Sequence, residues 1–328
     1  MNMKKIFPIV PLVAVLLISM VYIYSWTETA PTNGLQTIIY SHELRPYVYR
    51  ILAPALSRFL VESLSLRMDL SVWIVQTGFA LGFYLSSLSI LNLYLTDRNK
   101  SALIAFIPSI LVYALIIPYG KMYDMGTAFL FTLCLSLLAR RKFILFCIAY
   151  FVACWNRETM FLMSLFFAVY FFQKMEWPKF IIMLMYQGVV FLGTKIMINM
   201  AFADTPGDAF LFRPLENIYL FIESPVMAMI TTSMIGALLF FVFRGWKQKP
   251  AFLRSIIIIL LPAQMILHFF LGYTFEFRVY IEIFPVLIFL SFPWRKGLHY
   301  ASNTQQNNTQ QNTFRTPRTN TGPSGEIY

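Results

Sequence analysis

The residues best suited to chemistry lie in one short stretch, 41–50, which reads SHELRPYVYR. It places a carboxylate, an imidazole and two guanidinium groups in a chain of 328 residues that is 58% hydrophobic and only 12% charged. We interpret Glu43 as a general base for a hydroxyl, with His42 sharing the role or orienting the carboxylate. The alternatives are an acid that pairs with Arg45 or is simply hydrated, and a solvated His42.

Arginines elsewhere in the chain could bind a phosphate. A guanidinium grips phosphate oxygens in two places and keeps its charge when water is removed. The alternative is a structural network in which Arg157–Glu158 and Glu276–Arg278 close one face of the molecule. Because neighbours one or two apart on a helix do not face each other, each would then reach a partner on another helix. The candidate phosphate ligands are Arg45, Arg50, Arg157, Arg278 and Lys121.

Further polar residues accompany these arginines. Asp124 opens a predicted helix, where it could position the acceptor or leaving group as a second catalytic carboxylate, or merely cap the helix. Lys121 could bind phosphate or extend to the membrane surface. Tyr280 could stack on a sugar, although such tyrosines are more typical of an aromatic belt. The predicted substrate-binding set also includes Asn156, Glu158 and Glu276.

Several classes of site are not indicated. The sequence has no glycine-rich nucleotide loop, zinc-ligand spacing or serine elbow, so we expect no cofactor and leave metal dependence open. Cys134, Cys147 and Cys154 lie in apolar runs and are expected to pack as small hydrophobic residues. The formal charge of +11 is spread over small basic clusters rather than one surface, which argues against nucleic acid as a partner.

The elements that must position these residues are apolar helices. A mean hydropathy of +0.65 predicts an all-α, polytopic membrane protein with about ten spanning helices, since about 20 residues cross the hydrocarbon. The four segments from 101 to 173 are short, so pairs of them could merge or re-enter. The predicted spans are 6–24, 70–95, 101–118, 124–139, 142–156, 158–173, 179–201, 218–243, 254–272 and 279–294.

Charge predicts the orientation of these helices. With the N-terminus inside, every short inner connection is basic, as the positive-inside rule requires. The paired acids and arginines then fall on the outer side, where topology alone gives no reason for them. We expect a multi-pass protein of the inner cell membrane with both termini cytoplasmic. The apolar run after Lys5 is long enough to be an uncleaved helix rather than a signal peptide.

We divide the chain into a transmembrane domain, 1–296, and a disordered cytoplasmic tail, 297–328, rich in Asn, Gln and Thr. Within the first outer connection, 25–69, apolar residues repeat at helical spacing and predict an amphipathic helix over 46–66 in the membrane surface. Pro54 predicts a kink or a late start there. The later outer segment 203–217 is predicted to be a turn-rich loop.

Four short motifs carry a resemblance to a family. They are Tyr49-Arg50-Ile51-Leu52-Ala53-Pro54, Tyr123-Asp124, Asn156-Arg157-Glu158-Thr159, and Glu276-Phe277-Arg278 with Pro285 beyond. Together they resemble a group of bacterial polytopic proteins that is similar to the GT-C superfamily of membrane glycosyltransferases, over roughly 41–285.

That resemblance implies a function. In the GT-C superfamily a carboxylate in the first outer loop, followed by an interfacial helix, serves an inverting sugar transfer from a polyprenyl-phosphate donor. Glu43 and the helix expected from Pro46 match this placement. Two departures are that Glu43 has His42 rather than a second acid beside it, and that no large soluble domain follows.

We therefore expect an extracytoplasmic glycosyltransferase, with a polyprenyl-phosphate sugar and membrane lipid as partners. One alternative is a transporter or flippase for a lipid-linked glycan or another anionic lipid, for which Lys195 and His268 are the only deep polar candidates. Another is a membrane O-acyltransferase, whose histidine could only be His42. The sequence does not indicate the sugar, the acceptor or the oligomeric state.

Overall fold

The computed structural model describes residues 9–29, 36–37, 39–40, 45, 47–116, 122–207, 212–272 and 276–294. Over these residues the regular structure is helical, apart from one isolated β-bridge, which confirms the all-α class. The predicted tail, 297–328, lies outside them. The α-helices are α2 (Ile9–Thr29), α4 (Leu52–Leu64), α5 (Met68–Leu91), α6 (Arg98–Ile116), α7 (Asp124–Ala139), α8 (Phe143–Cys154), α9 (Phe161–Phe171), α10 (Trp177–Ala201), α11 (Pro214–Glu223), α12 (Pro225–Phe243), α13 (Ala251–Leu271) and α14 (Phe284–Ser291), and the 3-10 turns are η1 (Tyr47–Tyr49), η2 (Glu158–Met160), η3 (Trp246–Gln248) and η4 (Phe277–Tyr280).

Four helices, α5, α10, α12 and α13, are long and apolar enough to cross a membrane. Large apolar side chains on them face outward, among them Met200 on α10, which is 76% exposed, and Met229 on α12, which is 72% exposed. An apolar surface of this kind is typical of contact with lipid rather than water. Each of the other six predicted spans contains a helix, but the total of about ten crossings stays a prediction.

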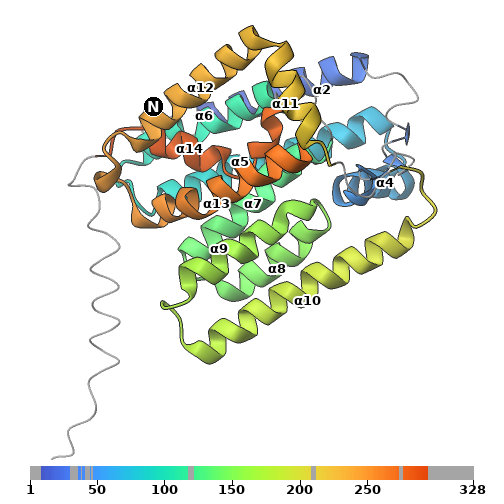
Figure 1. Ribbon diagram of the computed structural model, residues 1–328. Helices are drawn as coiled ribbons and strands as arrows, with labels where there is room; N and C mark the ends of the chain where they lie inside the picture. The colour runs from blue at the N-terminus through green and yellow to red at the C-terminus, as the bar shows by residue number, and fades with distance from the viewer. Residues whose placement is uncertain are drawn as a thin grey trace, which may run out of the picture.

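The helices run back and forth between two ends of the bundle (Figure 1). Helix α5 lies at the centre and packs against α2, α4, α6 and α7. The short helices α8 and α9 pack against α7 and α13 respectively, and α10 covers both of them. At one end the chain turns at α4, at the start of α7 and between α8 and α9, so these turns are brought near each other.

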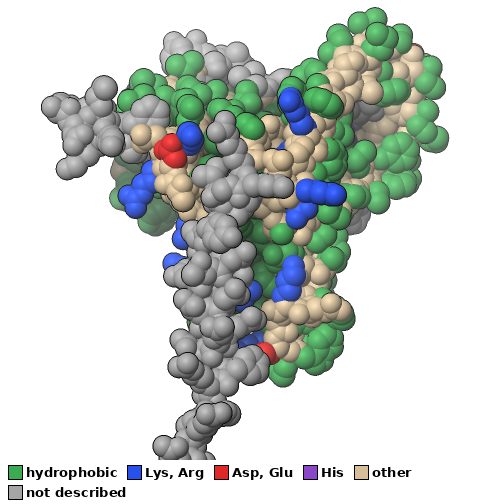
Figure 2. Space-filling model, turned by 90° about the vertical axis from the view of Figure 1, so that its left-hand side faces the viewer, with side chains coloured by type: hydrophobic (Ala, Val, Ile, Leu, Met, Phe, Trp, Pro, Cys, Tyr) green, Lys and Arg blue, Asp and Glu red, His purple; other side chains and the backbone are tan. Residues whose placement is uncertain are grey.

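The opposite end of the bundle is basic. Figure 2 shows this face, with Lys and Arg side chains spread over it and few acids among them. Exposed basic residues at or near the ends of helices include Arg98, Arg141, Lys174 and Lys247. Such a charge distribution is what the positive-inside rule predicts for a cytoplasmic side.

One predicted span is wrong in its boundaries. The segment 218–243 was expected to be a single helix, but the structure has two, α11 and α12, and α11 begins within the predicted loop. The break falls at Ser224, whose φ of −117° and ψ of 63° are not helical. Proline at 225 explains it, because the residue before a proline avoids the helical conformation.

The predicted surface helix, 46–66, contains η1 and the shorter helix α4. Pro54 falls in the first turn of α4, where its missing N–H would have had no partner within the helix, so the helix starts late rather than kinking. The backbone N–H groups of Ile51 and Leu52 both donate to the carbonyl of Trp155, at 3.2 Å each. The first outer connection is thereby joined to the break between α8 and α9, while its position at a membrane surface stays a prediction.

Candidate functional site

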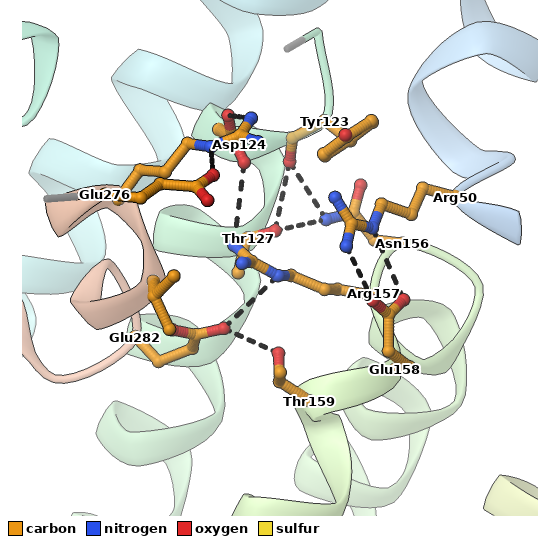
Figure 3. A network of polar contacts seen from close by, with 12 residues as sticks. Arg50, Tyr123, Asp124, Thr127, Asn156, Arg157, Glu158, Thr159, Glu276 and Glu282 are labelled. Carbon is orange, nitrogen blue, oxygen red and sulfur yellow. Dashed lines mark hydrogen bonds and ion pairs between the residues drawn. The ribbon is translucent and has the colours of Figure 1, made fainter. Parts of the chain in front are cut away.

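Asp124 is the centre of a buried polar network at the end of the bundle opposite the basic face. It is the first residue of α7 and has no exposed surface. A negative charge at this position interacts favourably with the helix dipole. Its Oδ2 lies 3.2 Å from Nη1 of Arg278 and its Oδ1 lies 3.5 Å from Nη1 of Arg157. A single carboxylate therefore holds two arginines that are far apart in the sequence (Figure 3).

Arg278 comes from η4, near the end of the chain's described part. Its Nε donates to Glu276, and its guanidinium is also bonded to Asp124. The expectation that Glu276 and Arg278 would not face each other is wrong, because Glu276 precedes the 3-10 turn in a non-helical conformation. Burial alone would lower the pKa of Arg278, but the charges of Asp124 and Glu276 outweigh it and raise the pKa above its usual value.

Arg157 lies between two carboxylates. Its Nε is 3.5 Å from Oε1 of Glu282, on the opposite side from Asp124. Neither contact is a hydrogen bond, and within the described part of the chain Nε and Nη1 of Arg157 have no hydrogen-bond acceptor. The side chain is nevertheless buried. The network thus contains a dehydrated guanidinium whose donors are not fully used.

Glu282 is held by hydrogen bonds from two other elements. It has no exposed surface, and it accepts from Oγ1 of Thr159 at 2.5 Å and from Nε2 of Gln264 at 2.8 Å. These bonds fix both carboxylate oxygens. Glu282 therefore serves as a rigid counter-charge to Arg157 rather than as a mobile acid.

Arg50 and Glu158 form a second, bidentate ion pair. Nη2 of Arg50 is 2.6 Å from Oε1 of Glu158, and Nε is 3.3 Å from Oε2. The guanidinium carbon also lies 4.4 Å from the centre of the Tyr123 ring. Glu158 thus holds Arg50 through two bonds, and it is the more exposed partner of the pair.

Asn156 ties the end of α8 to the start of α7. Its Nδ2 donates to the carbonyl of Tyr123 at 3.1 Å and to Oγ1 of Thr127 at 2.9 Å. Gly126 makes this approach feasible, because a Cβ atom there would lie 2.9 Å from Oδ1 of Asn156. The asparagine thereby fixes the chain beside Arg157, while its Oδ1 has no hydrogen-bond partner in the described part of the chain, so its predicted role in substrate binding stays a prediction.

The structure brings seven of the predicted site residues into this network. Tyr280 lies beside it, but its hydroxyl is bonded to Nδ1 of His268 at 2.9 Å. Within the described ranges the Nε of Arg45 has no hydrogen-bond partner, and its backbone N–H donates to the carbonyl of Pro206 at 3.0 Å. Glu43, His42 and Lys121 lie outside the described residues. The seven are Arg50, Asp124, Asn156, Arg157, Glu158, Glu276 and Arg278.

Sequence reasoning missed several members of the network. Glu282 lies inside a predicted span, and a charged residue there is by default a functional candidate, so this signal was present. Thr159 stands in one of the four motifs but was not predicted as a site residue. Thr127 and Gln264 gave no signal, because uncharged polar residues are common in membrane helices and their partners depend on how the helices are rotated.

No metal centre accompanies the network in the described ranges, where no group of three or more His, Cys, Asp or Glu residues could hold an ion. The cysteines occur as free thiols, with Cys134 and Cys154 buried and Cys147 partly buried. They pack as the sequence predicted.

No protein-family model, no curated protein and no solved structure matches this chain. The resemblance to the GT-C superfamily therefore stays a prediction that depends on the motifs alone.

Proposed function

We propose that this protein is a membrane glycosyltransferase that takes a sugar from a polyprenyl-phosphate donor and transfers it to an acceptor at the end of the bundle opposite the basic face. The observation that carries the proposal is Arg157, a buried guanidinium with hydrogen-bond donors that no described residue satisfies. A phosphate oxygen is the acceptor best matched to such a group.

The other arginines are assigned a supporting role. Arg50 is hydrogen-bonded to Glu158, and Arg278 is hydrogen-bonded to Glu276 and Asp124, so their donors are largely occupied. Each is paired with a carboxylate, so these ion pairs fix the surroundings of Arg157 rather than adding net positive charge. Arg157 itself is then already in place where negative charge develops on the leaving phosphate, and charge placed in advance in this way is the largest catalytic term in many enzymes.

A lipid-borne donor suits the surroundings of the network. The helices around it expose apolar side chains, and the basic face that would lie in the cytoplasm is at the other end of the bundle (Figure 2). The site would then face away from nucleotide sugars in the cytoplasm. A sugar linked to a polyprenyl phosphate can approach within the membrane plane.

The acceptor hydroxyl requires a base, and we assign this role to Glu43. The nearest described residue, Arg45, is fixed by its backbone contact with Pro206 and by an isolated bridge to Gly207. The backbone is therefore fixed at Arg45, only two residues after Glu43. A general base of this kind contributes about 100- to 10,000-fold to the rate.

The test is sugar transfer by the purified protein from polyprenyl-phosphate sugars. Arg157→Met should lower the rate by about 100- to 1,000-fold, and Glu43→Gln should also remove most of it. Lys179→Met is the matched control, because Lys179 is exposed and pairs with the exposed Glu176. Donor binding without any product, together with movement of the donor across a vesicle membrane, would contradict the proposal in favour of a flippase.

A further inference from the structure

Helix α10 carries another cation with unused donors, Lys195. Its Nζ atom is buried and has no hydrogen-bond partner within the described part of the chain. Lysine side chains in membrane helices normally extend to the surface, because an ammonium is costly to keep inside. This side chain instead turns toward the protein.

The position of Lys195 on α10 is at the edge of the lipid-facing surface. Leu192 and Ile196 are 61% and 58% exposed, whereas Thr194 and Ile198 are buried. Helix α10 packs against α8 and α9, the two helices that carry the Asn156–Glu158 segment between them. Lys195 is therefore placed where the exposed face of α10 meets the helices that carry this segment.

Lys195 is also electrostatically linked to the network. Its charge acts on both Glu158 and Arg50, although no ion pair within 4 Å joins it to a described acid. An ammonium has three donors, and these remain available here. Its charge is thus close enough to belong to the site, while its hydrogen bonds are left to a ligand.

We propose that Lys195 is a further substrate-binding residue, which holds the phosphate of a long-chain lipid as it enters from the side of α10 toward Arg157. The ligand class is a phosphate ester on a polyprenyl chain. This inference rests on the proposed function, because it names where the donor of that reaction is first bound.

The test is binding of polyprenyl phosphate to the purified full chain in detergent, followed by tryptophan fluorescence or native mass spectrometry. Lys195→Met and Lys195→Gln should weaken binding by about 10- to 100-fold, the usual effect of losing a charged hydrogen bond. Lys195→Arg should retain most of it, and Lys179→Met should bind like the wild type. Lys195→Gln keeps a polar side chain, so it provides the measurement if Lys195→Met fails to fold.

Three further probes show which part of the ligand is recognised: neutral polyprenol, inorganic phosphate and phosphatidylglycerol. The proposal expects polyprenol to bind weakly and equally to all variants. It is overturned by wild-type affinity in both Lys195→Met and Lys195→Gln, or by an equal loss for neutral polyprenol. Inorganic phosphate or phosphatidylglycerol binding as tightly as polyprenyl phosphate would overturn the assignment of the ligand.

Arg157→Met separates this inference from the proposed function. Lost binding in Arg157→Met with unchanged binding in the Lys195 variants would reject the role of Lys195 and leave the transferase proposal intact. Wild-type binding in all of these variants would reject both.

Discussion

Replacing Asp124 by alanine should lower the free energy of unfolding by about 3–5 kcal/mol, the usual cost of breaking a buried ion pair from one side. The structure indicates why the effect is large. At an effective dielectric constant of about 20, unit charges separated by the 3.2 Å between Asp124 and Arg278 attract by roughly 5 kcal/mol before desolvation. Arg157, at 3.5 Å, loses a partner as well. Two buried guanidinium groups would face each other without their common counter-charge.

Unfolding by sodium dodecyl sulfate, followed by circular dichroism, measures this cost. The matched control is Asp69→Ala, since Asp69 also lies in the first turn of a helix but its side chain is exposed and pairs with Arg67 at 2.7 Å, an interaction worth less than about 1 kcal/mol. The double variant Asp124→Ala/Arg278→Met should be less destabilised than the sum of its single variants. A cost for Asp124→Ala no larger than that of Asp69→Ala would refute the interpretation of the network as tightly coupled.

Three further outcomes are expected. Glu158→Ala leaves the buried guanidinium of Arg50 without the carboxylate that lies 2.6 Å from it and should cost about 1–3 kcal/mol in the same detergent assay, and wild-type stability would contradict the pairing. Gly126→Ala would press a methyl group against Asn156 and should cost about 1–3 kcal/mol in the same detergent assay, whereas wild-type stability would show that the contact relaxes freely. Glu282→Leu removes the acceptor of two hydrogen bonds and should cost about 3–5 kcal/mol, with a value below 1 kcal/mol counting against a structural role.

The sequence predicted which end of the bundle would carry the polar residues. Charge bias in alternate connections assigns the motifs at 123–124, 156–159 and 276–278 to one side, and the structure places them together there. The individual pairs could not be predicted, because they depend on helix rotation and on side-chain rotamers. Arg157 and Glu158 are neighbours in the sequence yet bond to different partners.

Two other differences have causes of their own. The break at Ser224 had a signal in the following proline, but the apolar composition on both sides predicted one continuous helix. Glu282 was assigned to a spanning segment and not to the site, because its hydrogen-bond partners are distant in the sequence. Thr159 is 123 residues away and Gln264 is 18 residues away. Uncharged hydrogen-bond partners of this kind leave no pattern in a single sequence.

The double contact of the Trp155 carbonyl with Ile51 and Leu52 has a consequence for engineering. Since it joins main chain to main chain, side-chain replacement in α4 cannot remove it, except for proline at a donor position. The outer surface of α4 should therefore tolerate wide sequence variation, including labels or grafted epitopes. Inserting one residue into the last turn of α8, in contrast, would displace the tether and Arg157 together.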